Sequence, residues 1–75
     1  MMLTSAPWVA GLRSLAHWPV RCNADSFEAV LLELERLAGL CGANVVVGIT
    51  IEVEVHEERP DSWLALGTAA QTEPG

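Results

Sequence analysis

The 75-residue sequence contains no lysine, and its four arginines are scattered along the chain. Because ten residues are acidic, the formal net charge is −6. Binding to nucleic acid or to an anionic membrane surface depends on clustered cations, which this chain does not have. We therefore expect neither nucleic acid nor a membrane as a partner.

Long apolar runs are also missing, since no stretch approaches the ~20 residues that span a bilayer. The N-terminal region has no basic segment ahead of an apolar core, and so does not follow the pattern of a secretory signal. We expect a cytoplasmic protein.

Cysteine is scarce, and two cysteines cannot form a disulfide scaffold. Hydrophobic residues nevertheless make up 51% of the chain. The length is enough for one small domain, residues 1–75, whose single core is marginal at this size. Oligomerisation is a usual source of further stability for such a domain.

Residues 26–40 carry apolar side chains at helical spacing and predict one amphipathic helix. Asp25 with Glu28 fits a capping box at the start of this helix. Gly42 suits the left-handed conformation at its exit. Cys41 falls on the apolar face, where we expect it to pack as a small hydrophobic residue.

Alternating apolar and polar residues follow the helix. Residues 45–58 predict a long strand whose odd-numbered valines and isoleucines share the face that meets the helix. Gly48 within it indicates a bulge or a close backbone approach. A turn at Pro60-Asp61 leads into a shorter return strand over residues 63–70, and residues 71–75 are expected to be a polar tail.

The N-terminal part predicts one strand within residues 9–22, after a loose lead-in over residues 1–7. The fold class is therefore α+β. Its expected architecture has two layers in the order strand-helix-strand-strand, with one helix on a small, mainly antiparallel sheet.

A tight turn at residues 60–61 would place Val55 opposite Leu66 and Val53 opposite Thr68, on the face that meets the helix. The opposite face would then be uncovered and open to a second copy of the chain. Tryptophan is enriched at interface hot spots, so we also weigh Trp8 as an interface residue against local packing over the small core. The candidate interface residues are Trp8, Trp63, Ala65, Gly67 and Ala69.

A row of four potential metal ligands lies at two-residue spacing on one strand face, about 6.7 Å apart. One strand cannot build a tetrahedral shell from its own side chains, so a divalent metal ion would need ligands from a second chain. The alternative is a solvated polar face. The row consists of Glu52, Glu54, His56 and Glu58.

Cys22 and Cys41 flank the predicted helix, which would hold them about 24 Å apart. A disulfide between them is therefore excluded, since it needs Cα atoms within ~7 Å. Cys22 follows Arg21 and precedes the helix N-terminus, which makes it a candidate for a lowered pKa. It is also a candidate metal ligand contributed by a neighbouring chain.

Catalytic motifs are missing. No nucleophile-base-acid spacing is visible around His17 and His56, which are the only imidazoles. Neither a P-loop nor a Gly-x-Gly-x-x-Gly string occurs. We expect a protein that is not an enzyme.

Residues 40–49 (LCGANVVVGI), followed later by residues 66–69 (LGTA), resemble the YbjQ-like family over roughly residues 27–70. Proteins of this family are often described as heavy-metal-binding domains. The resemblance implies a strand-helix-strand-strand fold that assembles into a ring, commonly a pentamer.

Three functions remain open. The first is a non-enzymatic, self-assembling module, a cyclic homo-oligomer that acts as a scaffold or as a ring binding a small ligand or ion. The second is a heavy-metal-binding protein with a site between subunits. The third is a small accessory subunit that clasps a larger enzyme through Trp8 and the N-terminal arm.

Overall fold

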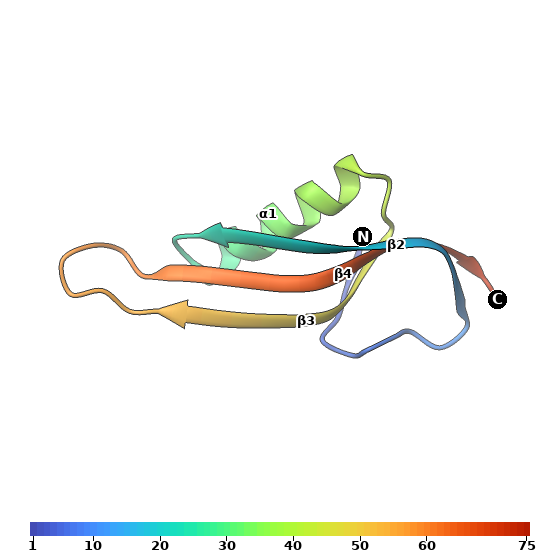
Figure 1. The fold of residues 1–75 in the computed structure, drawn as a ribbon, viewed down its shortest axis with the longest axis horizontal. Coiled ribbons are helices and arrows are strands. Elements are labelled where there is room, and N and C mark those ends of the chain that lie inside the picture. Colours follow the sequence, from blue (N-terminus) through green and yellow to red (C-terminus); the bar gives the residue numbers. More distant parts are fainter.

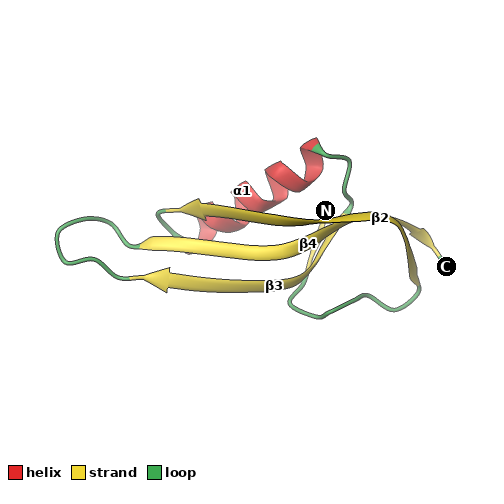
Figure 2. Ribbon diagram, viewed as in Figure 1, coloured by secondary structure: helices red, strands yellow, loops and turns green.

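The computed structural model describes residues 1–75 as one helix packed on a four-stranded mixed sheet (Figure 1). The elements are β1 (Met2–Leu3), β2 (Leu12–Ala24), α1 (Phe27–Leu40), β3 (Val45–Glu54) and β4 (Ser62–Pro74). The sheet order is β1-β3-β4-β2, in which β1 is parallel to β3 and the other neighbours are antiparallel. The predicted α+β architecture is confirmed. Figure 2 shows the helix on one face of the sheet, and this helix is neither long nor apolar enough to cross a membrane.

The helix cap differs by one residue from the prediction. Ser26 is the N-cap in extended conformation, and its Oγ accepts a hydrogen bond from the Ala29 backbone N–H at 3.1 Å. Asp25 is therefore not the capping residue, although a capping residue was correctly expected just ahead of the apolar run. The buried face of α1 consists of Val30, Leu34 and Ala38.

The helix exit follows the expected geometry at Gly42, which has φ +88°. Cys41 is the C-cap and is exposed, so the expectation that it packs in the core is wrong. Beyond the exit, Asn44 is tied to Thr72 of β4 by three hydrogen bonds. Its Nδ2 donates to the Thr72 carbonyl at 3.1 Å, and its Oδ1 accepts from the Thr72 backbone N–H and Oγ at 3.0 and 2.9 Å. The predicted polar tail is thus part of β4 as far as Pro74.

A β-bulge at Gly48 exchanges the two faces of β3. The pairing with β4 shifts by one residue between Val47 and Thr50, and Gly48 adopts φ +61°. Ahead of the bulge Val46 packs beneath α1, while Val45 and Val47 belong to a separate core on the other face. The prediction that all odd-numbered residues of the strand meet the helix is therefore wrong before the bulge. Beyond the bulge it holds for the two isoleucines.

The β3–β4 connection is a wide loop over residues 55–61 rather than a tight turn. Val53 pairs with Trp63 instead of Thr68, an odd-numbered shift that exchanges the faces of β4. This register places beneath the helix the β4 residues that the sequence predicts for the uncovered face. Their small side chains let α1 approach the sheet closely. Ala65 and Ala69 are fully buried in the helix-side core, and Trp63 packs against it.

The second face of the sheet is partly covered by the N-terminal segment. Residues 1–7 are not a loose lead-in, since β1 pairs with β3 and the chain then stays bonded to it. The carbonyl groups of Thr4 and Ala6 accept hydrogen bonds from the backbone N–H groups of Ile49 and Gly48 at 3.2 and 2.7 Å. Val9 packs against the small core on this face. Figure 1 shows the segment bowing beneath the sheet before it enters β2.

Candidate functional site

The predicted metal row is not assembled within one chain. Glu52 and Glu54 lie at the end of β3, but His56 and Glu58 lie in the loop, because the strand ends at Glu54. His56 Nε2 is 3.9 Å from Glu54 Oε1, and its Nδ1 is 3.4 Å from the guanidinium of Arg59. No group of three or more His, Cys, Asp or Glu side chains is placed to hold a metal ion. A metal site that uses this row would therefore need ligands from a second chain.

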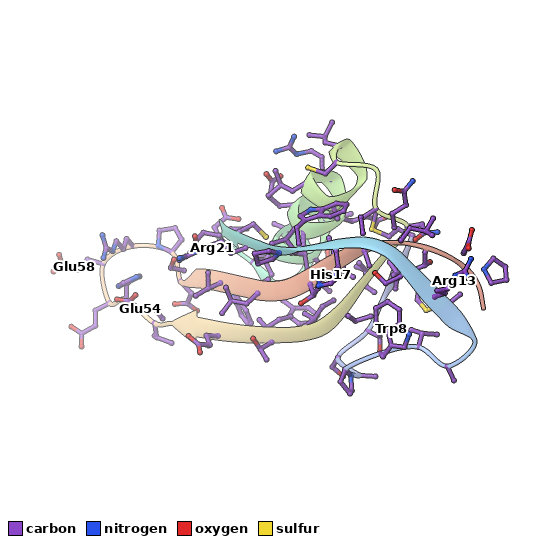
Figure 3. The ribbon with its side chains drawn as sticks, turned by 45° about the vertical axis from the view of Figure 1, so that its right-hand side comes forward. Trp8, Arg13, His17, Arg21, Glu54 and Glu58 are labelled. Atoms are coloured by element: carbon purple, nitrogen blue, oxygen red, sulfur yellow. The ribbon has the colours of Figure 1, made fainter.

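A cavity of about 430 Å³ lies between this loop and the adjoining ends of β2 and β3. Carboxylates of Asp25, Glu54 and Asp61 line it together with His56 and Arg59. Because His56 contacts both an acidic and a basic neighbour, part of this charge is compensated within the loop. The arrangement fixes the hairpin loop against the strand ends. In Figure 3, Glu54 and Glu58 mark this end of the molecule.

Cys22 is buried in the helix-side core, with 7% of its surface exposed. Its thiol donates a hydrogen bond to the Val30 carbonyl at 3.4 Å. Burial, and secondly the nearby Glu33, raise the pKa of the Cys22 thiol. The expected lowering is wrong because Cys22 faces α1, whereas Arg21 next to it in the strand faces the other side of the sheet. A thiol held protonated is also a poor metal ligand.

The tryptophans have different surroundings. Trp63 packs edge-on against Phe27, with ring centroids 5.8 Å apart and an interplanar angle of 70°. Trp18 packs against the same core, and its buried Nε1 has no hydrogen-bond partner. Trp8 is 37% exposed, and its Nε1 donates to the Leu12 carbonyl at 3.0 Å. Whether Trp8 and Trp63 form an interface remains a prediction, but Trp63 lies on the helix side of the sheet.

Both long edges of the sheet are at least partly open. β2 has no neighbour on its outer side. The outer edge of β3 is occupied by the N-terminal segment as far as Ile49, and residues 50–54 are free.

An apolar strip adjoins the free part of β3, since α1 lies mainly over β2 and β4. We define the strip as Phe27, Ile51, Val53 and Val55. Phe27 is 48% exposed and Val53 46% exposed. Ile51 and Val53 therefore carry apolar side chains on the unpaired part of β3, and Phe27 lies against Trp63, the β4 partner of Val53.

A second cavity, the loop-side pocket, has a volume of about 420 Å³ and lies between the N-terminal segment and the sheet face away from α1. Residue spacing did not suggest it, because its walls come from three segments that are distant in the chain. Gly48 was the one available signal, since a bulge was expected there. The pocket is lined by Pro7, Trp8, Leu12, Ser14, His17, Val47 and Thr68.

Together these features define a small α+β domain with partly open sheet edges and two surface cavities of similar volume. The chain matches no family model, and no curated protein matches its sequence. Its fold is similar to the crystal structure of a protein of unknown function from Pediococcus pentosaceus, which belongs to the DUF74 family. The TM-score is 0.62 at 15% identity, over 100% of this chain and 98% of that chain. Since DUF74 is the YbjQ-like family, the fold implied by residues 40–49 and 66–69 is shared.

Proposed function

We propose that this protein is a non-enzymatic, self-assembling subunit of the YbjQ-like family that forms a cyclic homo-oligomer. The observation that carries the proposal is that the sheet has an open edge on each side. The two edge strands, β2 and β3, run in the same direction. The ring would serve as a cytoplasmic scaffold or as a carrier of a small ligand, without nucleic acid or membrane as a partner.

The subunit is extended for its length. Its radius of gyration is 13.3 Å and its dimensions are 49 × 22 × 16 Å, whereas a compact domain of this length has a radius of gyration of about 11 Å. Only ten of its 75 residues are buried. A chain that leaves so much apolar surface in contact with water gains stability from a partner.

The strand directions are compatible with a ring. β2 and β3 are both antiparallel to β4, and so they run parallel to each other. A rotation axis along the strands therefore brings the free edge of β3 beside the β2 edge of the next copy, with both strands in the same direction. Such a contact joins two different surfaces, and it closes into a ring when the rotation is an integral fraction of a turn.

The apolar strip supplies the hydrophobic part of this contact. Burying the exposed half of Val53 would contribute about 1 kcal/mol, and Phe27 about as much again. The backbone groups of residues 50–54 would gain partners at the same time. The YbjQ-like resemblance, which implies a ring that is commonly pentameric, supports the same assembly.

The experiment compares native mass spectrometry and sedimentation velocity of the wild type with those of Val53→Lys. We expect the wild type to form one closed species, and the variant to dissociate, because a lysine at a strand edge opposes pairing. Leu32→Lys is the matched control: Leu32 is 68% exposed on the outer face of α1, so this variant should keep the ring. A wild type that is monomeric at micromolar concentration would refute the proposal. A stable complex with a larger protein only, without self-association, would favour an accessory subunit instead.

A further inference from the structure

Two β-bulges lie near the loop-side pocket, one in β2 and one in β3. In β2 the pairing shifts between Ser14 and Ala16, so that Ser14 and His17 line the pocket together despite their odd spacing. In β3 the bulge turns the Gly48 N–H outward to the Ala6 carbonyl, at 2.7 Å. Bulges are common beside functional sites, where they redirect side chains and end strand pairing. The bulge in β2 thus places a hydroxyl group and an imidazole on the same wall of the pocket.

The outer wall of the pocket is held at several points. The N-terminal segment is bonded to β3 through the Thr4 and Ala6 carbonyls. At its far end the Trp8 indole donates to the Leu12 carbonyl at 3.0 Å, and the Leu12 N–H donates to the Val9 carbonyl at 3.4 Å. The indole is therefore fixed in the wall, and a ligand would meet a preformed pocket rather than order a loose loop.

The lining of the pocket indicates the chemistry of a ligand. Trp8, Leu12 and Val47 provide an aromatic and aliphatic surface, and Ser14, His17 and Thr68 provide hydrogen-bonding groups. No carboxylate lines the pocket, although the chain has ten acidic residues and a net charge of −6. The volume of about 420 Å³ falls within the range of small-molecule sites, roughly 300–1,000 Å³.

We infer that the loop-side pocket binds a small planar aromatic anion, whose ring lies beside Trp8 and whose charged group meets His17 and the two hydroxyl groups. A cationic ligand would instead require acidic residues in the lining. None of the pocket residues belongs to the apolar strip or to the free edge of β3, whereas Leu12, Ser14 and His17 lie in β2, whose outer edge takes part in the proposed ring.

The test is calorimetric titration of the full chain with the aromatic sulfonate 8-anilinonaphthalene-1-sulfonate. We expect one dye molecule per chain in the wild type. In His17→Glu the Kd should rise at least about tenfold, because the added carboxylate would lie beside the sulfonate and repel it. His17 is exposed, so this change leaves the core intact. Trp8→Leu should also weaken binding, through loss of the aromatic wall.

Asn23→Glu is the matched control, since Asn23 lies on the same strand and the same face but outside this pocket. The two positions are six residues apart along the strand, about 20 Å, which exceeds the screening length of about 8 Å at physiological salt. Its Kd should equal that of the wild type. Equal binding by His17→Glu and Asn23→Glu would place the dye elsewhere, for example on the apolar strip, and would overturn the inference. So would the absence of saturable binding to the wild type.

Discussion

Gly67 occupies the most crowded glycine position in the sheet, and its replacement by alanine tests the register of the β3–β4 pair. A Cβ atom at Gly67 would lie 2.9 Å from Val46 Cγ1, 3.2 Å from the Val47 carbonyl oxygen and 3.3 Å from Ile49 Cγ1. Val46 is fully buried beneath α1, and Val47 contributes a backbone atom. Neither of these neighbours can move aside easily.

The expected loss of stability is the balance of two effects. Overpacking in a well-packed core costs about 1–3 kcal/mol. Alanine recovers about 0.5–1 kcal/mol, because glycine loses more conformational freedom on folding. We therefore expect Gly67→Ala to lower the free energy of unfolding by about 1–2 kcal/mol. For a domain of this size the corresponding fall in Tm is roughly 5–15 °C.

Thermal unfolding followed by circular dichroism, at one fixed protein concentration, measures this change. Gly39→Ala is the matched control. Gly39 lies in α1, and an added Cβ there meets only Met1 Cε, at 3.6 Å. This control should raise the free energy of unfolding by about 0.5–1 kcal/mol. If Gly67→Ala were as stable as the wild type, Gly67 would not pack beneath Val46, and the β4 faces described above would be wrong.

Three further predictions concern the helix exit, the cysteines and the metal row. Asn44→Ala should destabilise the fold by about 1–2 kcal/mol, because three hydrogen bonds to Thr72 are lost. An unchanged free energy of unfolding in urea would contradict this role. Iodoacetamide at pH 8 should modify the exposed Cys41 much faster than Cys22, whose raised pKa leaves less thiolate at any given pH. Peptide mass spectrometry measures the two rates, and faster modification of Cys22 would refute its burial. The dissociated Val53→Lys chain should bind Zn²⁺ with a Kd of about 1 mM or higher, since only Glu54 and His56 of the row lie near each other. Tight binding that is lost in a Glu54→Ala, His56→Ala double variant would show a site within one chain.

The helix could be predicted closely because its determinants are local. The apolar spacing and the small polar residues ahead of it fix α1 to within one residue of the predicted start. Gly42 at its exit follows equally from local backbone geometry. The sequence of one helix followed by two strands, and with it the α+β class, follows from the change of period after this glycine.

The faces of the sheet could not be predicted, because they depend on pairings that the local pattern does not encode. One residue inserted at Gly48 reverses the face of every residue before it, although apolar residues occupy the odd-numbered positions on both sides of the glycine. The loop over residues 55–61 sets the register of β4. The alternating pattern predicts a strand as far as residue 58, and so it places the first part of this loop in the strand. The loop-side pocket depends on both bulges and on β1, a pairing across more than 40 residues of chain.

The position of β4 has a consequence for how the chain folds. The last strand in sequence is central in the sheet, bonded to β3 on one side and to β2 on the other. Leu12, at the start of the first long strand, pairs with Pro74. During synthesis β2 therefore stays without its neighbour until β4 has emerged, and most of the sheet forms late and cooperatively. A deletion at the C-terminus would remove the centre of the sheet rather than an edge, and would leave β2 and α1 without the strand that joins them to β3.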